Sequence, residues 1–539
     1  MKVKQRVLAC SALILLAGTV LSACSKEGSK TNTPSVTPNA SQKPGDTAMS
    51  KPLELSVAVW DIETGFNAPN AKNDTVYNDL TKKFNITIKP IQITWNDWEE
   101  KAKVWAASNQ LPDMFADVLA TGNIGLYQTW AKQGVLKALP DDLSSYPNLK
   151  KAMSNEAVQP YKVDGKFYTV PRFGGEDVGD GRLGRPIRYR KDWAAEAGYT
   201  KDPASFEEFV TMTKAVMLKH PGIAGLTVNA KDYLYTTFLG SFPDMVYPDN
   251  WSKENGKWIP SFTSERAYTG IQQLRTLYTD GILDKDFATQ KDADGTNKFL
   301  NGQSFALFGD VVEAPKVEAF KKANPGVEVS KAIGYMNIWP AADGKRYTPG
   351  GAPFWSETLF PATLDEEKFK RALQVLDYMM SDEYRVLVAS GIKNVDYKVD
   401  NEKYVSVLKP DEKLDDKYPI TRKLGWLAAW DPTYFKGKAV ISSDPDFAAV
   451  QKDQLDTFNR YKQEDTLMPL HFEFDAVITP AKSKFQALGN DIRNDIIKVI
   501  LGKGDPIAQW KEIVKSYDSK GVPEAIKEVN DEVAKRGIK

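Results

Sequence analysis

Cysteine and histidine are scarce in this 539-residue chain, and an excess of charge of either sign is absent. The two cysteines, Cys10 and Cys24, lie near the N-terminus, so no disulfide can form within the rest of the chain. With only His220 and His471 besides, a cysteine-rich zinc site is excluded and histidine-based catalysis has few candidates. Lys+Arg and Asp+Glu both number 71, and this balance argues against a nucleic-acid partner.

The remaining composition is that of a globular protein. Hydrophobic residues make up 42% and charged residues 26%, which allows a large buried core. The length is too great for one ordinary domain and favours two or three lobes. The chain also has 13 tryptophans and 22 tyrosines. Most such rings are expected in the core, although aromatic-rich surfaces are also typical of proteins that bind sugars or peptides.

The first 23 residues have the pattern of a secretory signal peptide. Three basic residues precede an apolar stretch, Val7 to Leu21, which is too short and too close to the N-terminus for an ordinary membrane-spanning helix. The stretch ends in Leu21-Ser-Ala-Cys24, which resembles the lipobox of bacterial lipoprotein precursors. The resemblance implies cleavage before Cys24 and acylation of its sulfur, so Cys24 is the expected lipid anchor. The alternative is an ordinary signal peptide with an incidental cysteine.

Residues 24–52 form the expected acylated cysteine and a disordered tether. The segment is rich in Ser, Thr, Pro, Asn and Lys and shows no apolar periodicity, so it cannot bury enough surface to fold. Together with the anchor, it predicts that the folded part works at the extracellular face of the cell membrane.

The start of the folded part alternates strands and helices. Strict alternation predicts a strand over 53–60, and two more strands are expected over 85–93 and 112–118. Helical spacing of apolar residues predicts helices over 74–84 and 96–108 between them. This β-α-β-α-β order predicts a parallel, doubly wound sheet.

Further elements follow along the chain. Ser205 and Glu208 form a capping-box pattern at the start of a helix. Other helices are expected from Ser264 to Gly281, over 369–380, over 507–517 and over 523–536, with strands over 305–308 and 332–339.

Short motifs along nearly the whole folded part carry a family resemblance. These are Leu111–Met114, Val163–Pro171, Ile187–Trp193, Ala204–Glu208, Tyr278–Leu283, Phe299–Phe308, Met379–Tyr384 and Gly521–Ile526. Each motif is weak alone, but in this order they resemble the family 1 extracellular solute-binding proteins, the carbohydrate receptors of ABC importers. The resemblance extends to the large lipoprotein branch found in Gram-positive bacteria such as Paenibacillus. It implies an α/β fold of the periplasmic-binding-protein type, class II: two doubly wound lobes joined by a hinge, with the ligand cleft between them.

The resemblance also implies lobe boundaries. Lobe one is expected over 53–169 and 335–388, and lobe two over 174–332 and 393–539, with extra C-terminal helices. The expected hinge crossings are 170–173, 333–340 and 389–395.

Eight residues are predicted to contact the ligand. Ligands of open α/β sheets bind beyond the carboxyl ends of the strands, and the resemblance adds positions near the crossings and on lobe two. The predicted residues are Trp60, Asp61, Asp117, Arg172, Tyr233, Tyr235, Asp310 and Trp355. Trp60 and Trp355 would offer flat surfaces to the C–H face of a sugar ring, and the charged groups would bind its hydroxyls.

Several of these assignments have a structural alternative. The alternative for Trp60 is a structural role at the end of its sheet, and Trp95, Trp98 and Trp105 show helical spacing that fits either the core or the cleft rim. Five arginines lie between Arg172 and Arg190. They would favour an acidic sugar if they faced the cleft, but acidic residues lie among them, and a solvated loop is the better interpretation.

No cofactor is expected. Asp292-Ala-Asp-Gly295 hints at a calcium loop, but Thr296 and Gln303 occupy positions where the EF-hand pattern needs ligands. A surface turn is therefore the better interpretation, and calcium binding stays a weak alternative.

The expected function is capture of a carbohydrate and its delivery to the transmembrane subunits of an ABC importer by a monomer anchored in the membrane. A receptor for a peptide or another small solute is one alternative, because lobe architecture does not fix the ligand. A secreted carbohydrate-active enzyme is another, but neither a nucleophile elbow nor a P-loop is present, so no enzymatic activity is expected.

Overall fold

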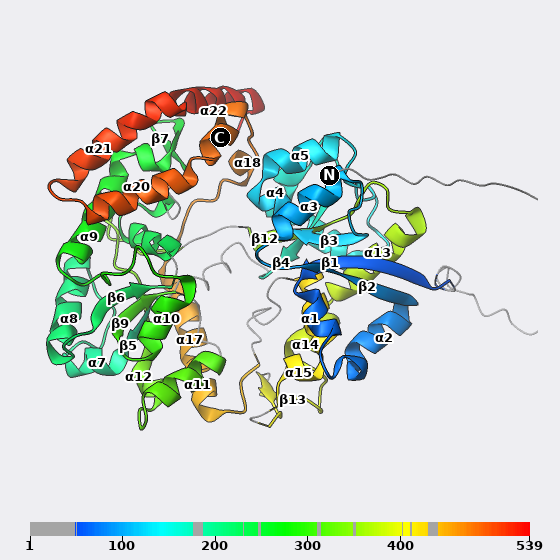
Figure 1. Ribbon diagram of the computed structural model, residues 1–539, viewed down its shortest axis with the longest axis horizontal. Coiled ribbons are helices and arrows are strands. Elements are labelled where there is room, and N and C mark those ends of the chain that lie inside the picture. The colour runs from blue at the N-terminus through cyan, green and yellow to red at the C-terminus, as the bar shows by residue number, and fades with distance from the viewer. Residues whose placement is uncertain are drawn as a thin grey trace, which may run out of the picture. The chain divides into compact units, whose positions relative to one another are not determined.

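Two separate sheets organise the computed structural model (Figure 1). The structure describes residues 49, 51–175, 187–229, 231–245, 250–309, 314–348, 352–401, 403–409, 412–429 and 440–538. Residues 51–539 form one compact unit. The predicted signal peptide, Cys24 and nearly all of the tether lie outside the described residues, as do Asp310 and two of the five arginines, Arg182 and Arg185.

The first sheet has the strand order β2-β1-β3-β12-β4. Its strands are β1 (Leu53–Trp60), β2 (Ile86–Ile93), β3 (Met114–Asp117), β12 (Phe354–Leu359) and β4 (Thr169–Phe173). β1 pairs in parallel with both β2 and β3, as the β-α-β-α-β order in the sequence predicts. β12 runs antiparallel to β3 and β4, so the sheet is mixed. This arrangement brings the carboxyl ends of β1, β3 and β4 and the start of β12 to the same edge.

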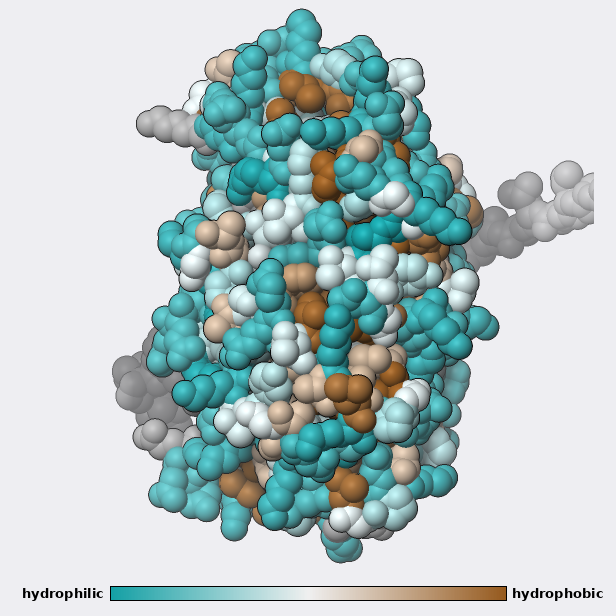
Figure 2. Space-filling view, turned by 90° about the vertical axis from the view of Figure 1, so that its left-hand side faces the viewer, coloured by the Kyte–Doolittle hydropathy of each residue, from teal (hydrophilic) through white to brown (hydrophobic). Residues whose placement is uncertain are grey.

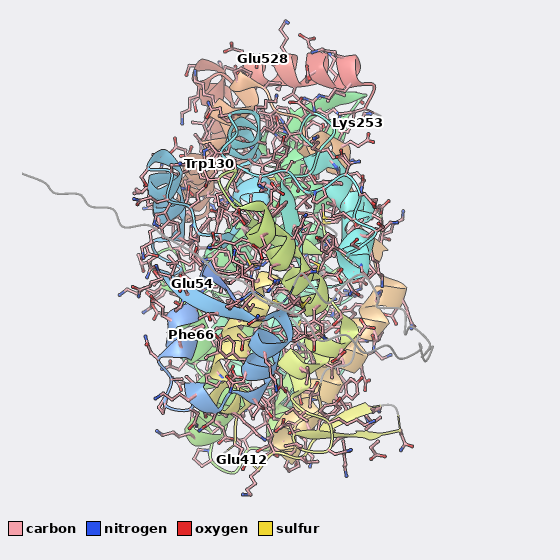
Figure 3. All side chains as sticks on the ribbon, turned by 90° about the vertical axis from the view of Figure 1, so that its right-hand side faces the viewer. Glu54, Phe66, Trp130, Lys253, Glu412 and Glu528 are labelled. Carbon is pink, nitrogen blue, oxygen red and sulfur yellow. The ribbon has the colours of Figure 1, made fainter. Side chains whose placement is uncertain are left out.

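Helices cover this sheet to form lobe one. They are α1 (Ile62–Phe66), η1 (Ala71–Asn73), α2 (Thr75–Phe84), α3 (Trp98–Ala107), α4 (Leu119–Gly122), α5 (Ile124–Lys132), α6 (Pro147–Met153), η2 (Glu156–Tyr161), α13 (Glu366–Met379), α14 (Asp382–Ser390), α15 (Leu414–Lys417), α16 (Pro419–Leu424) and η8 (Gly425–Leu427). A short hairpin, β13 (Tyr397–Asp400) and β14 (Lys403–Ser406), follows α14. Phe66, labelled in Figure 3, is at the end of α1. Its ring meets that of Tyr77 of α2 edge to face, with 5.5 Å between ring centroids.

The core of lobe one joins the sheet to α3 and α5. Ala58 and Phe115 from neighbouring strands pack with Ala102 of α3 and Tyr127 of α5, and all four are buried. Because alternate side chains of a strand face opposite sides, one face of β1 and β3 is committed to these helices. Helices α2, α13 and α16 also contact β1 or β2.

The second sheet has the order β10-β5-β9-β6. Its strands are β10 (Ile333–Met336), β5 (Ile187–Arg190), β9 (Ser304–Phe308) and β6 (Ala224–Val228). Only β6 and β9 pair in parallel, whereas β5 is antiparallel to both of its neighbours. The remaining elements of lobe two are α7 (Lys191–Glu196), α8 (Phe206–Lys219), η4 (Lys231–Gly240), η5 (Pro243–Met245), β7 (Trp251–Glu254), β8 (Lys257–Pro260), η6 (Ser261–Thr263), η7 (Glu265–Ala267), α9 (Tyr268–Thr279), α10 (Asp292–Leu300), α11 (Ala314–Ala323), α12 (Val329–Ala332), β11 (Tyr347–Thr348), α17 (Pro445–Glu464), β15 (Thr466–Leu467), α18 (Phe472–Asp475), α19 (Pro480–Gln486), α20 (Gly489–Leu501), α21 (Pro506–Ser516), η10 (Tyr517–Lys520) and α22 (Val522–Arg536).

Two of the predicted lobe boundaries need correction. β10 pairs within the second sheet, and Arg346 donates to the carbonyl of Pro203, so lobe two continues to about residue 348. The chain after 393 does not pass at once to lobe two, because α16 packs on α1. The backbone N–H of Thr421 donates to buried Asp74 at 2.7 Å. Lobe one therefore extends through Ala429, and lobe two resumes with α17, which contacts α11, α12 and β10.

The predicted helix starts are largely confirmed. Ser205 Oγ accepts the backbone N–H of Glu208 at 3.2 Å, as in a capping box. The Glu208 carboxylate reaches back one residue further than predicted, to the N–H of Ala204 at 2.6 Å. The suspected calcium loop is the first turn of α10, where the Asp294 carboxylate accepts the N–H of Lys291. Gly295 lets this turn approach β6, since a Cβ there would overlap the carbonyl of Val228.

The face of the molecule in Figure 2 is mainly hydrophilic, with hydrophobic side chains in separate small patches. Such scattered apolar groups are normal on protein surfaces and need no partner. Among the described residues, no helix combines the length and the apolar character needed to cross a bilayer.

Candidate functional site: a tryptophan cluster at the edge of the first sheet

Four of the eight predicted ligand residues meet at one edge of the first sheet. Trp60 ends β1 and Asp117 ends β3, while Arg172 is near the end of β4 and Trp355 near the start of β12. The ring centroids of Trp60 and Trp355 are 5.8 Å apart, and the Arg172 guanidinium lies 4.7 Å from the Trp60 ring. Asp117 is the register partner of Glu357 on β12. The mixed sheet thus collects residues that are almost 300 positions apart.

Five indole rings form a cluster here, which we call the tryptophan platform: Trp60, Trp95, Trp98, Trp355 and Trp426. Trp60 is fully buried and stacks on Trp95, with centroids 4.8 Å apart and planes 10° from parallel. Trp95 also contacts Trp355 and Trp426. It remains 47% exposed, although large aromatic side chains are usually covered. Trp95 is therefore the most exposed ring of the platform, and buried Trp60 packs against one of its faces.

Arg172 is buried beneath the platform. It donates from Nε to the carbonyl of Trp426 and from Nη1 to Ser356 Oγ at 2.9 Å. Its Nη2 has no partner among the described residues. Burial lowers the pKa of Arg172 to about 9, against the opposing effect of the Glu357 charge. Arg172 thus positions Trp60 and Trp426, and its Nη2 group stays available under the rings.

Two buried carboxyl groups lie on the neighbouring strands β3 and β12. Burial raises the pKa of Asp117 to about 7, although the backbone N–H of Val118 donates to it at 2.7 Å. Burial and the neighbouring Asp117 charge raise the pKa of Glu357 to about 8. Perturbed carboxyl groups of this kind gather at functional sites more often than elsewhere.

Glu357 also fixes the backbone that follows β3. It accepts the N–H of Ala120, and its Oε2 lies 3.2 Å from Thr121 Oγ1. The Thr121 hydroxyl donates to the carbonyl of Trp355. A protonated Glu357 completes this chain, because its O–H can donate to Thr121 while Thr121 donates onward. Glu357 therefore ties α4 to the strand that carries Trp355.

Asp61 follows Trp60 in a left-handed conformation, with φ 56° and ψ 24°. Such a conformation is unusual for a non-glycine residue and tends to occur at functional sites. Its carboxylate has no hydrogen-bond or ion-pair partner among the described residues and is partly exposed. Asp61 is thus placed beside the platform with its carboxylate open to a ligand.

The ligand residues predicted on lobe two have a different outcome. Tyr235 is 0% exposed and belongs to the lobe-two core beside Phe238, so a ligand has no access to it in this conformation. Tyr233 belongs to η4, but its side chain, like Asp310, lies outside the described residues. Tyr235 is apolar enough to pack in the core, which is why segment position alone misplaced it.

The arginine run does not line the platform as a group. Arg190 is 3% exposed and pairs with Asp192 at 2.6 Å, and Arg188 is fully buried in β5. Both belong to the second sheet, whereas Arg172 belongs to the first. Their geometry therefore gives no support to an acidic ligand held by several arginines, nor are these two residues in a solvated loop.

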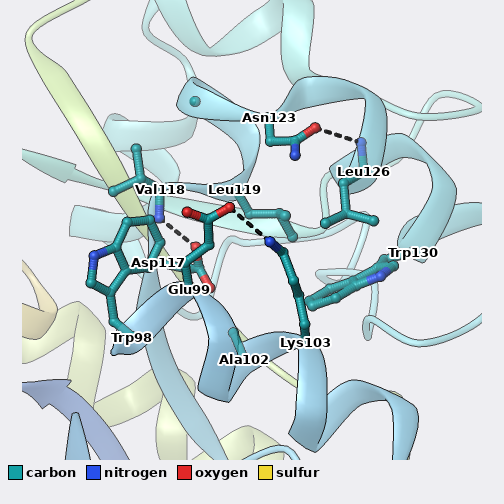
Figure 4. Close-up of a pocket in the computed structure, with 11 residues that line it drawn as sticks. Trp98, Glu99, Ala102, Lys103, Asp117, Val118, Leu119, Asn123, Leu126 and Trp130 are labelled. Atoms are coloured by element: carbon teal, nitrogen blue, oxygen red, sulfur yellow. Dashed lines mark hydrogen bonds and ion pairs between the residues drawn. The ribbon is translucent and has the colours of Figure 1, made fainter. Parts of the chain in front are cut away.

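A small pocket adjoins the platform, shown in Figure 4. It has a volume of about 160 Å³ and is bounded by the first turns of α3, the end of β3, α4 and the start of α5. Its lining residues include Trp98, Ala102, Asp117, Asn123 and Trp130. Trp98 is shared with the platform, because its ring meets Trp60 edge to face at 5.7 Å.

Among the described residues, no group of three or more His, Cys, Asp or Glu side chains is arranged to hold a metal ion. The buried carboxyl groups Asp117 and Glu357 are occupied by backbone N–H groups, as described above.

Sequence reasoning missed two residues of the site. Glu357 had a usable signal, because it is the one charged residue of the otherwise uncharged strand Phe354–Leu359. Trp426 follows a short helix and carried no pattern that distinguishes it from a core residue. Trp95 was left between core and cleft rim, and the structure places it at the surface.

Comparisons with known proteins agree with this architecture. The model for bacterial extracellular solute-binding proteins matches residues 75–390. The chain is 24% identical to lipoprotein LipO of Bacillus subtilis over 347 residues, covering 61% of this chain and 65% of LipO, slightly less than two thirds. It is 23% identical to the polygalacturonan/rhamnogalacturonan-binding protein YtcQ of the same organism, over 83% of this chain and 86% of YtcQ.

Solved structures show the same fold. The alginate-binding protein AlgQ2 superposes with a TM-score of 0.64 at 17% identity, covering 91% of this chain and 99% of AlgQ2. The Streptococcus pneumoniae substrate-binding protein FusA, solved with kestose, superposes with a TM-score of 0.62 at 16% identity, covering 90% and 99%. Both are class II two-lobe binding proteins, and this fold class is the one expected from the sequence. The family match spans more than half of the chain, which therefore belongs to the bacterial extracellular solute-binding proteins.

Proposed function

We propose that this protein is a lipid-anchored, extracytoplasmic receptor that captures an oligosaccharide and delivers it to an ABC importer. The observation that carries the proposal is the tryptophan platform, in which exposed Trp95 rests on buried Trp60. A sugar ring has an apolar C–H face that fits a flat indole and a rim of hydroxyls that needs polar partners. Asp61, which directly follows Trp60, and Asp117, which lines the pocket shared with Trp98, would supply such partners.

The relatives support a saccharide ligand. YtcQ is named for two pectic polysaccharides, AlgQ2 for alginate, and FusA was solved with a fructan oligosaccharide. These names concern proteins of low identity, so they favour the carbohydrate class and leave the particular sugar open. The family consists of binding proteins, which argues against catalysis by this chain.

The proposed mechanism is closure of the two lobes on the ligand. A ligand that touches both lobes only in the closed arrangement shifts the population toward that arrangement. The closed form would then be recognised by the importer's transmembrane subunits, and a separate ATPase would supply the energy. The acylated Cys24 and its tether would keep the receptor, acting as a monomer, close to the importer.

The test of ligand class is a binding panel. Neutral and uronate-containing oligosaccharides, peptides and amino acids are screened by thermal shift, since a ligand of the folded state raises its melting temperature. Hits are measured by calorimetry with Trp95→Ala and with Trp95→Phe as the matched control. We expect a saccharide hit whose affinity falls about tenfold or more in Trp95→Ala and less in Trp95→Phe, from the loss of ring contact.

Three results would contradict the proposal. Stabilisation by peptides but not by saccharides would favour the peptide receptor, and turnover of a saccharide instead of stoichiometric retention would favour an enzyme. Trp95→Ala with unchanged saccharide affinity would remove the platform from the site. Equal or tighter binding of neutral oligosaccharides would end the idea of an acidic ligand.

Anchoring is tested separately. The protein is expressed in a Gram-positive host with labelled palmitate, as native chain and as Cys24→Ser. We expect label and detergent-phase partitioning only in the native chain. Equal partitioning of the two proteins would leave an ordinary signal peptide as the better interpretation.

A further inference from the structure

The pocket beside the platform has a size that fits one sugar ring. Its volume is about 160 Å³, room for about five water molecules. Pockets that enclose a whole drug-sized ligand start at about 300 Å³. An oligosaccharide therefore cannot enter it entire, whereas a single ring at the end of a chain can.

The walls of the pocket resemble those of a small-molecule site. Trp98 and Trp130 lie at opposite sides in Figure 4, with Asp117, Glu99 and Lys103 between them. Apolar walls with a few convergent polar groups are the usual construction of ligand pockets. Since Trp98 also contacts Trp60, a ring in the pocket would be continuous with rings on the platform.

Among the polar groups that line this space, the buried Asp117 carboxyl group accepts hydrogen bonds when it is ionised. Asp117 is 3% exposed, and its carboxyl group accepts one hydrogen bond from a described residue, the N–H of Val118. A carboxylate has room for several more donors. The only cation that lines the pocket, Lys103, is already paired with Glu99 at 2.9 Å and with Glu100 at 3.2 Å.

The charges of the pocket disfavour an anion. Asp117, Glu99 and Lys103 sum to one negative charge when Asp117 is ionised, and buried Glu357 is the neighbour of Asp117 across the strands. A carboxylate brought into this space would lose its hydration and gain no unpaired cation. Hydroxyl groups, in contrast, can donate to Asp117.

We propose that the pocket between α3 and α4–α5 is a subsite for one uncharged ring at the end of a glycan, with Asp117 accepting hydrogen bonds from its hydroxyls. The inference rests on the proposed saccharide-binding function and adds a selectivity that the function alone does not contain. According to this inference, Asp117 disfavours a uronate as the end ring, although two of the similar proteins are named for acidic polysaccharides.

The experiment uses ligand pairs that differ only in the carboxyl group. These are tetrasaccharides of galacturonate and of alginate, each with its carboxyl-reduced product, in which linkage and length are unchanged. Calorimetry compares the native protein with Asp117→Asn, which keeps the shape, and with Ala102→Leu, which fills the pocket. Ala107→Leu is the matched control, because Ala107 is exposed on the same helix outside the pocket. Melting temperatures verify that every variant is folded.

We expect the native protein to bind at least one carboxyl-reduced tetrasaccharide at least tenfold more tightly than its acidic parent. Asp117→Asn should reduce that ratio to below threefold, and Ala102→Leu should weaken binding at least tenfold. Ala107→Leu should stay within twofold of the native protein.

The failure of the subsite and the failure of the function give different results. If Trp95→Ala abolishes saccharide binding while both pocket variants bind as the native protein does, the subsite is refuted and the proposed function stands. Tighter native binding of the acidic members also refutes the subsite alone. If no saccharide of these pairs or of the wider panel binds, both proposals fall.

Discussion

Replacing Glu357 by glutamine tests the protonation state of the buried carboxyl group that holds the site together. The side chain is 1% exposed and burial raises its pKa to about 8, so it is mainly protonated at pH 7. Glutamine has the shape of the protonated acid. Its carbonyl can accept the N–H of Ala120, and its NH₂ can donate to Thr121, which still donates to Trp355. The substitution therefore removes the titration and keeps the hydrogen bonds.

The sign of the effect follows from proton uptake. In the unfolded chain Glu357 has its ordinary pKa and is ionised above about pH 5, while the folded protein retains the proton to about pH 8. The folded state then binds more protons, so its stability falls as pH rises through this window. One group contributes at most about 1.4 kcal/mol per pH unit, which gives about 2 kcal/mol between pH 6 and pH 8.

The assay is urea unfolding of the native protein and Glu357→Gln at pH 6, 7 and 8. Asp117 titrates in both proteins with the same sign, so the difference between them reports the titration of Glu357 together with its coupling to Asp117. We expect Glu357→Gln to gain about 2 kcal/mol relative to the native protein from pH 6 to pH 8. Glu512→Gln, at an exposed position of α21, is the control and should show no such trend. Parallel stability curves for the native protein and Glu357→Gln would refute the reasoning.

Three further substitutions test the packing of lobe two and its helix ends. Arg275 is buried and donates to three carbonyl groups at and beyond the end of α20. Arg275→Met should therefore lower the free energy of unfolding in urea by about 3 kcal/mol. The control Lys498→Met, at an exposed position, should be nearly neutral. Gly295→Ala would stabilise an isolated helix, but overlap with the carbonyl of Val228 should make it destabilising by about 1–3 kcal/mol; a raised melting temperature would contradict this packing. Ser205→Ala removes the cap of α8 and should cost about 1 kcal/mol, measured as a shift in the urea midpoint, and an unchanged midpoint would mean that the cap is not needed.

Local sequence patterns were enough to predict most elements of the fold. The alternation of Leu53–Trp60 and the cap at Ser205 depend on neighbours within one or two turns, and the structure has these features where they were expected. The pairing of strands that lie far apart in the sequence was harder to predict. The antiparallel insertion of β12 between β3 and β4 joins segments roughly 180 to 240 residues apart, and no periodicity encodes the direction of such a pairing.

The return of α16 to lobe one has the same cause. Its contacts depend on Asp74, whose carboxylate accepts from Thr421, and on Gly65, where a Cβ would overlap the carbonyl of Pro419. Nothing in the sequence around either residue indicates that its partner lies some 350 positions away. The predicted boundary at 393 therefore followed the family pattern and missed the added segment, which also brings Trp426 to the platform.

The candidate site combines an exposed ring with buried residues that support it. Trp95 rests on Trp60, Trp60 lies against Arg172, and Arg172 is held by Ser356 and by the backbone of Trp426. Each of these supporting residues lies at a strand end or in the α16 segment, so the sheet holds the exposed Trp95 ring in a fixed position. A flat surface on a fixed base loses little freedom when a sugar ring stacks on it. We therefore expect substitutions of Trp60 or Arg172 to weaken a ligand that stacks on Trp95, although these buried side chains do not touch it.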